Sequence, residues 1–201
     1  MTEKSLSHSP AAERNRIPTG QVLCRWLAPD ARVLEIGSGT GQHAAWFHSL
    51  LPELAWQTTD LPENLDAIEA RLKEESPALP APISLDVMAA DDWPEGPWDA
   101  VYTANTLHIM PWDHTPALIR AAAECVIPGG LLVVYGPFRD GEEFDAESNR
   151  RFDEQLRQRN PDMGLRDVLK VRRMAEDTGW SAEAEIAMPA NNRLLIFRKS
   201  E

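Results

Sequence analysis

The sequence predicts a single α/β domain in which helices cover both faces of a mostly parallel sheet. Residues 32–36 form an apolar run that breaks into a glycine-rich loop and then a helix, the pattern of a strand that turns sharply into a helix. Apolar runs and helical patterns alternate from there to residue 136, which is typical of βαβ units. The last two runs, 181–188 and 193–198, have a connection so short that the final strand is expected to be antiparallel.

Each element follows from apolar spacing and from turn residues. Short apolar runs bounded by polar or turn residues predict seven strands, at residues 32–36, 54–60, 83–87, 98–105, 131–136, 181–188 and 193–198. A leading helix is expected from about Pro18, which suits a first helical position. Apolar residues that recur every three or four positions predict further helices, at residues 41–51, 62–75, 115–126 and 165–179.

The charge balance favours a small-molecule ligand over a nucleic acid. The chain of 201 residues carries 20 basic and 32 acidic residues, a net charge of -12, whereas binding to a phosphate backbone depends on clustered Lys and Arg. The local exception is a group of basic residues between Arg150 and Arg173. That group either meets an anion or forms a solvated helix face among interleaved acids.

Cysteine usage and the absence of targeting patterns predict a cytoplasmic protein. Cys24 and Cys125 lie in apolar helical patterns, which favours buried, reduced thiols over a disulfide. The sequence has neither a signal-peptide core nor an apolar stretch long enough to span a membrane. We therefore expect a cytoplasmic monomer or homodimer, with no bound metal, no membrane partner and no nucleic-acid partner.

The glycine loop after the first strand has the chemistry of a cation-bearing nucleoside site. Gly37, Gly39 and Gly41 alternate, whereas the dinucleotide fingerprint would place its third glycine at Gln42. Glu35 precedes them, and a carboxylate there favours a positively charged ligand over a pyrophosphate. Asp60 ends the second strand, where nucleotide-binding folds place an acid that accepts hydrogen bonds from a ribose diol.

The segment Glu35-Ile-Gly-Ser-Gly-Thr-Gly41, followed by Asp60 and Asp86, resembles the class I S-adenosylmethionine-dependent methyltransferases. A closer resemblance runs from Ser9-Pro-Ala-Ala-Glu-Arg-Asn15 through Tyr135-Gly-Pro-Phe138 and Ser148-Asn149 to Met188-Pro-Ala-Asn-Asn192. These stretches are similar to a little-characterised bacterial family related to the animal methyltransferase-like protein 26. The resemblance implies a Rossmann-like, seven-stranded sheet of order 3-2-1-4-5-7-6 with strand 7 antiparallel.

The resemblance also implies S-adenosylmethionine as cofactor and S-adenosylhomocysteine as its product. In the family pattern, an acid after the third strand accepts a hydrogen bond from the adenine amino group and the next residue packs against the ring. Asp86 and Val87 fill these places, unless Asp86 only caps the following turn. The expected cofactor-binding residues are Glu35, Gly37, Ser38, Gly39, Gly41, Asp60, Leu61, Asp86, Val87 and Asn105.

We divide the chain into a mobile tail at residues 1–12 and one methyltransferase domain at 13–201. The domain carries a helical insertion at about 138–167, which is expected to bind substrate. In class I methyltransferases a leading segment often helps to cover the cofactor, so by resemblance Arg14 and Asn15 are candidate lid residues. The alternative is that they are only the polar flank of a helix.

Residues just past the strand ends of a parallel sheet face the ligand crevice, so candidates for catalysis are sought there. A base is needed only if the acceptor must lose a proton, and our order of preference is His108, then Asp153 or Tyr135. Each has an ordinary structural alternative. His108 could be a structural hydrogen-bonding residue, Asp153 could only form an exposed ion pair, and Tyr135 could only pack in the core. His43 and His114 are expected on helix surfaces, with weaker claims.

Substrate contacts are expected from three further places. Trp112 follows the fourth strand, close to His108. Asn149, Asp153 and Arg157 form one polar edge of the inserted helix, although the last two could be only an exposed pair. Asn191 and Asn192 lie in the final hairpin turn, where asparagine is also an ordinary turn residue.

These observations support two functions of different class. The first is S-adenosylmethionine-dependent methyl transfer to a small-molecule acceptor by in-line displacement. The second is a catalytically silent protein of the same fold that binds the cofactor as a scaffold or regulator. The glycine spacing disfavours a nicotinamide-dependent oxidoreductase.

Overall fold

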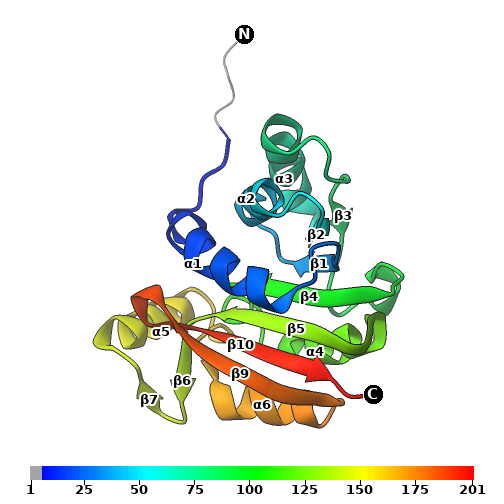
Figure 1. The fold of residues 1–201 in the computed structure, drawn as a ribbon. Helices are drawn as coiled ribbons and strands as arrows, with labels where there is room; N and C mark the ends of the chain where they lie inside the picture. The colour runs from blue at the N-terminus through cyan, green and yellow to red at the C-terminus, as the bar shows by residue number, and fades with distance from the viewer. Residues whose placement is uncertain (1–5) are drawn as a thin grey trace.

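The computed structural model describes residues 6–201, and its centre is a seven-stranded sheet of order β3-β2-β1-β4-β5-β10-β9 (Figure 1). The strands β1 to β5 are all parallel, whereas β10 is antiparallel to both of its neighbours. The predicted fold class and strand order are therefore confirmed. The strands are β1 (Arg32–Ile36), β2 (Ala55–Asp60), β3 (Ile83–Ser84), β4 (Trp98–Ala104), β5 (Val126–Gly136), β9 (Trp180–Met188) and β10 (Asn192–Lys199).

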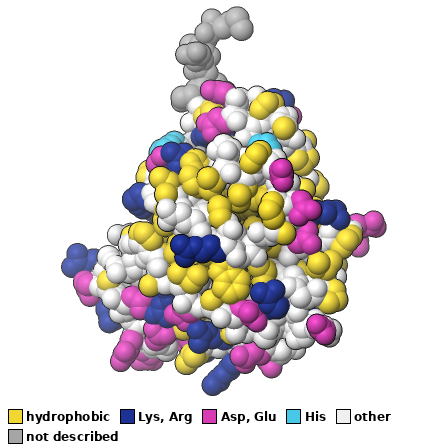
Figure 2. Space-filling view, in the orientation of Figure 1, with side chains coloured by type: hydrophobic (Ala, Val, Ile, Leu, Met, Phe, Trp, Pro, Cys, Tyr) yellow, Lys and Arg dark blue, Asp and Glu magenta, His cyan; other side chains and the backbone are white. Residues whose placement is uncertain are grey.

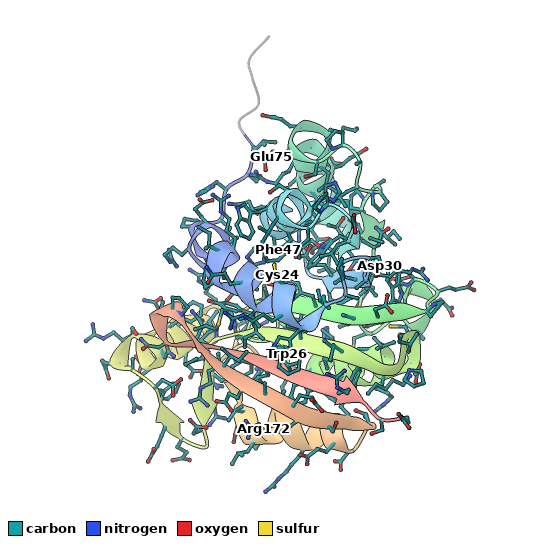
Figure 3. All side chains as sticks on the ribbon, in the orientation of Figure 1. Cys24, Trp26, Asp30, Phe47, Glu75 and Arg172 are labelled. Carbon is teal, nitrogen blue, oxygen red and sulfur yellow. The ribbon has the colours of Figure 1, made fainter. Side chains whose placement is uncertain are left out.

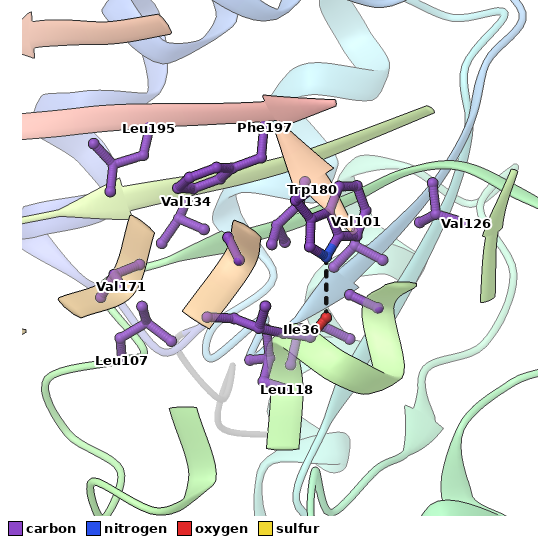
Figure 4. Packing of buried hydrophobic residues seen from close by; sticks show 14 of the residues in the cluster. Ile36, Val101, Leu107, Leu118, Val126, Val134, Val171, Trp180, Leu195 and Phe197 are labelled. Carbon is purple, nitrogen blue, oxygen red and sulfur yellow. Dashed lines mark hydrogen bonds between the residues drawn. The ribbon is translucent and has the colours of Figure 1, made fainter. Parts of the chain in front are cut away.

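Helices cover both faces of this sheet, as Figure 1 shows. On one face, α1 (Pro10–Trp26), α2 (Gln42–Leu50) and α3 (Pro62–Glu75) pack over a core that includes Phe47 and Trp56. On the other face, α4 (His114–Cys125) and α6 (Val168–Glu176) close a second core. Figure 4 shows Trp180 in this second core, where its indole Nε1 donates to the main-chain oxygen of Ile119 at 3.2 Å.

The leading helix begins earlier than the sequence analysis predicts. Helix α1 starts at Pro10 after the N-cap Ser9, whose Oγ accepts a hydrogen bond from the Ala12 amide at 3.3 Å. A Ser-Pro pair is a strong start signal, because Ser caps the free amides and Pro lacks the amide that would stay unpaired. The expected tail is therefore wrong at residues 10–12, and Pro18 lies inside the helix. Residues 1–5 of that tail lie outside the described residues.

The segment after β5 contains a second, three-stranded sheet that periodicity did not predict. Strands β6 (Phe138–Asp140), β7 (Glu143–Phe144) and β8 (Arg166–Asp167) form it in the order β7-β6-β8, and α5 (Glu147–Arg159) is the expected inserted helix. Arg193 of β10 fastens this segment to the main sheet, because its guanidinium bonds to Asp140 and Asp145. Two short 3-10 turns, Ala90–Asp92 and Pro189–Asn191, complete the described elements.

Two surface features bear on the sequence predictions. Cys24 of α1, labelled in Figure 3, is an exposed free thiol, so the prediction that it is buried is wrong; Cys125 is half-buried. Acidic and basic side chains are interspersed over α6 and β9 in Figure 2. Among the described residues, no helix has the length and hydropathy needed to cross a bilayer.

Candidate functional site

The main cleft lies at the carboxyl ends of β1, β2 and β4 and has a volume of about 510 Å³, within the usual range of ligand pockets. Nine of the ten expected cofactor-binding residues line it; the exception is Gly41, which lies at the N-cap of α2. The lining residues that had been expected are Glu35, Gly37, Ser38, Gly39, Asp60, Leu61, Asp86, Val87 and Asn105.

The glycine loop forms the floor of the cleft. Gly37, Gly39 and Gly41 all have positive φ, between 59° and 73°, which an L side chain rarely adopts. A Cβ at Gly37 would also lie 2.7 Å from the Thr106 hydroxyl, whereas a Cβ at Gly39 would meet nothing within 4 Å. Gly39 therefore leaves open space in the floor, and a ligand can approach the main chain there more closely than any other residue would allow.

Asp60 organises the loop as well as facing the cleft. Its Oδ2 accepts from the Gly39 amide at 2.6 Å, and its Oδ1 accepts from the Leu61 amide and the Asn64 side chain, both at 2.8 Å. A carboxylate has about four acceptor positions, so three are already used by the protein. The remaining position on Oδ2 can accept one ligand hydroxyl, which is one fewer than the diol prediction assumed.

Glu35 is a buried carboxyl at the end of β1, with an exposed fraction of only 2%. Its Oε2 accepts from the Ser38 hydroxyl at 2.9 Å and from Trp56 Nε1 at 3.0 Å. Burial raises the pKa of Glu35 from 4.5 to about 7, with a smaller contribution from Asp60, while these two hydrogen bonds oppose the rise. A cation near this carboxyl would stabilise its ionised form.

The third acid lies after a strand that is shorter than predicted. Strand β3 ends at Ser84, so Asp86 and Val87 belong to the turn that follows rather than to residues 83–87 of a strand. The Asp86 Oδ1 accepts from the Met88 amide at 2.9 Å, as the capping alternative requires, and Asp86 also lines the cleft. Both interpretations of Asp86 therefore remain compatible with the geometry.

The N-cap and first turn of α1 form a wall of the cleft, through Ser9, Ala11 and Ala12. The Ser9 amide donates to the Gln42 side chain at 2.5 Å. Arg71 of α3 bridges this segment to the glycine loop, because it donates to the main-chain oxygens of Ser7 at 2.6 Å and Thr40 at 2.8 Å. The leading segment thus borders the cleft, but with residues other than the predicted Arg14 and Asn15.

Asn15 instead holds a buried imidazole at the edge of the cleft. His43, which lines the cleft, has its Nε2 2.6 Å from Asn15 Oδ1 and its Nδ1 3.1 Å from the Tyr102 hydroxyl. Burial lowers the pKa of His43 to about 4, so the ring is neutral near pH 7. The amide oxygen only accepts, so Nε2 carries the proton and Nδ1 accepts from Tyr102. Both ring nitrogens are therefore engaged.

None of the three predicted bases lines the cleft. His108 is 5% exposed and packs edge-on against Phe152 of α5, with ring centroids 5.3 Å apart. Burial, with a smaller effect of Arg166, lowers its pKa to about 4. Asp153 is a buried residue of α5, where it accepts from Arg157 Nε at 2.7 Å and from the Leu165 amide at 2.6 Å. His108 thus matches its structural alternative, whereas Asp153 forms the expected pair with Arg157 but is buried rather than exposed.

Tyr135, the third candidate, is a buried phenol at the end of β5. Burial raises its pKa, while hydrogen bonds from Asn15 and Asn192 and the charge of Arg14 oppose the rise. Four predicted site residues, Arg14, Asn15, Tyr135 and Asn192, are thus brought together beside His43. They form a group next to the cleft rather than part of its lining.

The other predicted substrate residues lie in two places. Asn149 of α5 donates to the Asn191 main-chain oxygen at 2.9 Å, and Asn191 has a φ of 55°, so it is a left-handed turn residue. Trp112 and Arg157 line a separate cavity, described below. Asn105, a predicted cofactor residue, lines the cleft just past the end of β4; its φ is 59°, and its amide donates to the Tyr135 main-chain oxygen at 2.9 Å.

The polar residues of the cleft that were not chosen as site candidates include Gln42, His43, Asn64 and His114. Gln42 and His43 begin α2 directly after the glycine loop, and Asn64 lies one helical turn after Asp60, so their spacing from the motifs could have identified them. His114 begins α4 and lies 3.9 Å from Asp113 Oδ1. His114 follows the loop after β4, and this position could have identified it as a cleft residue.

The charge of the cleft lining is entirely acidic. The lining contains three carboxyl groups, those of Glu35, Asp60 and Asp86, and among the described residues that line it none is Lys or Arg. Such a lining attracts a cation and repels a pyrophosphate. Within residues 6–201, no group of three or more His, Cys, Asp or Glu side chains is arranged to hold a metal ion.

Solved structures with the same fold are methyltransferases. An O-methyltransferase family protein from Burkholderia thailandensis matches with a TM-score of 0.80 at 20% identity, over 92% of this chain and 56% of the other. Mitomycin 7-O-methyltransferase MmcR matches with a TM-score of 0.77 at 20% identity, over 92% and 54%. Human N-acetylserotonin methyltransferase, solved in complex with S-adenosylmethionine, matches with a TM-score of 0.74 at 18% identity, over 91% and 52%.

The chain spans about half the length of these structures, and at such identities the likeness establishes the class I methyltransferase fold. The sequence itself gives the family. Residues 6–199 match the family described as "Protein of unknown function (DUF938)", so the chain belongs to that family.

Proposed function

We propose that this protein binds S-adenosylmethionine and transfers its methyl group to a small-molecule acceptor. The observation that carries the proposal is the all-acidic lining of a cleft whose floor is the glycine loop. A dinucleotide or nucleoside triphosphate needs positive groups or free helix amides near its phosphates. Here a carboxylate holds the amide of Gly39 instead. A nucleoside that carries a positive charge suits this lining.

The residues present fit that cofactor. Gly39 leaves open space where a Cβ would otherwise stand, and Asp60 keeps one acceptor position for a hydroxyl. Asp86 and Val87 also line the cleft and are candidates for contact with the adenine. When bound, the cofactor supplies a methyl group that is already activated by the sulfonium. The relation to the methyltransferase-like protein 26 family and a cytoplasmic location are part of the same proposal.

The chain's own part in the reaction is to align the acceptor and, where needed, to hold its proton. His114 is our first choice for a base, because it is an imidazole in the cleft lining, whereas the other, His43, has both ring nitrogens engaged. We expect His114→Gln to reduce turnover on an acceptor that must lose a proton. An unchanged rate on such an acceptor would exclude this role.

Binding is tested first, by calorimetry with S-adenosylhomocysteine and with NADH as competing probes. We expect S-adenosylhomocysteine to bind and NADH not to bind. Glu53→Gln is a matched control for the acidic residues, because Glu53 is exposed and lies away from the cleft. No binding of S-adenosylmethionine or S-adenosylhomocysteine at millimolar levels would refute the proposal.

Methyl transfer is tested second, with radiolabelled S-adenosylmethionine and fractionated small-metabolite extracts. A labelled product supports the enzyme. The second candidate, a cofactor-binding scaffold without catalysis, is favoured by one observation: His108, Asp153 and Tyr135 all lie outside the cleft lining. Cofactor binding without labelled product across several extracts would favour that candidate.

A further inference from the structure

A second cavity, of about 250 Å³, lies beside the main cleft, and four of its nine lining residues are basic. Its walls come from the loop after β4 and from the segment between β6 and α6. We call it the basic cavity. It is lined by Trp112, Arg139, Arg157, Pro161, Asp162, Leu165, Arg166, Asp167 and Lys170.

The basic residues of this cavity are not balanced by carboxylates. Arg157 is paired with Asp153, at 2.7 Å. Within residues 6–201, Arg139, Arg166 and Lys170 form no salt bridge. The lining also contains Asp162 and Asp167, and the Asp167 carboxylate caps α6 through the Leu169 amide. With Arg157 neutralised by Asp153, the three cations Arg139, Arg166 and Lys170 face two acids, which leaves one positive charge in excess.

The neighbouring arginines of the same sequence region are used differently. Arg150 and Arg151 both pair with Glu147 on the surface of α5. Arg172, labelled on α6 in Figure 3, pairs with Glu185 of β9. The basic run seen in the sequence therefore divides into a solvated, paired face and a set that converges on the basic cavity. The paired residues match the solvated helix face, one of the two alternatives left open by the sequence.

Arg166 is the central residue of this set, because it is only 4% exposed yet has no acidic partner. Its guanidinium donates to two main-chain oxygens, those of Met110 and Asp162, and stacks 5.2 Å from the centre of the Trp112 ring. Its buried Nε has no hydrogen-bond partner among the described residues. A buried charge without a counter-ion is costly.

The pKa of Arg166 also indicates that its buried charge is poorly compensated. Burial, and then the charge of Arg157, lowers the pKa of Arg166 to about 10, while the charge of Asp153 opposes the fall, so the guanidinium is still charged near pH 7. An anion in the cavity would favour the charged guanidinium and so offset the effects of burial and of the Arg157 charge. In a protein with a net charge of -12, a buried concentration of positive charge is the reverse of what the overall composition favours.

We propose that the basic cavity binds a small organic anion through a phosphate or carboxylate group. Arginine and lysine side chains at Arg139, Arg166 and Lys170 provide the donors that such oxyanions require. The cavity holds about eight times the volume that one water takes in the liquid, so it has room for more than the oxyanion. The Trp112 ring offers an apolar surface to the rest of the molecule.

This site is distinct from the cofactor cleft, although the two share a wall. Met110 and Pro111 line the cleft, and the next residue, Trp112, lines the basic cavity. The proposal therefore goes beyond the proposed function and does not depend on it. Anion binding in the basic cavity requires no methyl donor.

The test is calorimetry of the full chain with inorganic phosphate and with citrate as probes. We expect saturable binding of at least one probe, weakened about tenfold or more by Lys170→Met, because a charge-assisted hydrogen bond is lost. Lys170 is exposed and makes no salt bridge or side-chain hydrogen bond among the described contacts, so this variant should fold normally. Arg159→Met removes the same charge from the exposed end of α5, outside the cavity, and should bind like the wild type.

A second readout locates the bound anion. In a nitrogen-proton correlation spectrum, the indole signal of Trp112, assigned with Trp112→Phe, should shift as the probe is added. Tighter binding of phosphate indicates a phosphoryl group, and tighter binding of citrate indicates carboxylates. Failure of both probes at tens of millimolar, or equal affinity of the wild type and Lys170→Met, would overturn the proposal.

Titration of the same samples with S-adenosylhomocysteine separates this proposal from the proposed function. Lys170→Met should leave that affinity unchanged, because Lys170 is absent from the cleft lining. If the wild type binds the anion but not S-adenosylhomocysteine, the proposed function fails while the basic cavity stands. If the wild type binds S-adenosylhomocysteine but not the anion, the basic-cavity proposal fails while the proposed function stands.

Discussion

Replacement of Glu35 by glutamine should make the protein more stable in alkaline solution while weakening its affinity for a cationic ligand. Glutamine has nearly the same shape, and its amide oxygen can accept the hydrogen bonds that Ser38 and Trp56 now donate to Oε2. The main difference is that glutamine does not titrate. The change therefore isolates the free-energy cost of ionising this buried carboxyl.

The size of the effect follows from the pKa of Glu35. In the unfolded chain this group ionises near 4.5, and in the folded protein near 7. Between these values the folded state keeps a proton that the unfolded state has lost, so the free energy of unfolding falls as pH rises. At about 1.4 kcal/mol per pKa unit, ionised Glu35 costs the folded protein about 3 kcal/mol.

The assay is urea unfolding of wild type and Glu35→Gln across the range from about pH 4 to about pH 8. The variant should gain about 3 kcal/mol relative to wild type over that range. His43 and His108 titrate in both proteins, so their effect cancels in the difference. The exposed Glu53→Gln is the control and should show no such gain. A difference between Glu35→Gln and wild type that does not vary with pH would refute the reasoning.

Three further predictions concern single residues. Asp60→Ala should lower the affinity for S-adenosylhomocysteine by roughly 2 kcal/mol or more, because a charged acceptor is lost; calorimetry that finds an unchanged dissociation constant would remove Asp60 from the site. His108→Gln should retain about 3 kcal/mol that wild type loses as pH falls from 6.5 to 4, because the unfolded chain protonates His108 first; identical acid unfolding profiles would contradict this. Arg193→Met should cost about 1 to 3 kcal/mol, since two aspartates and a glutamate lose their charged donor, and a thermal unfolding midpoint equal to that of wild type would count against it.

The central sheet could be predicted because its strands are buried. Runs such as residues 131–136 are apolar on both sides, and the short Pro189–Asn191 turn leaves only an antiparallel return for β10. The small sheet of β6, β7 and β8 could not be predicted, because strands of two or three residues show no periodicity. Ser9 and Pro10 could have predicted the start of α1. The prediction instead took Pro18 as the first helical position, although it lies inside the helix.

The candidate site was predictable where the motif itself defines the geometry. The glycine loop and Asp60 meet as expected, because both follow parallel strands that end at the same edge of the sheet. His108 lies past the end of β4 too, yet it is buried under α5 rather than in the cleft. The position of a residue at a strand end gives the edge of the sheet but not the direction of its side chain.

The bridge that Arg71 makes between Ser7 and Thr40 has a practical consequence for anyone who attaches a purification handle to this protein. A fusion at the N-terminus is connected through Ser7, which Arg71 ties to the glycine loop, so a force on the fusion acts on that loop. The other terminus follows β10, which runs antiparallel to β5 and so ends at the far edge of the sheet. A handle placed after Glu201 leaves the ligand entrance clear.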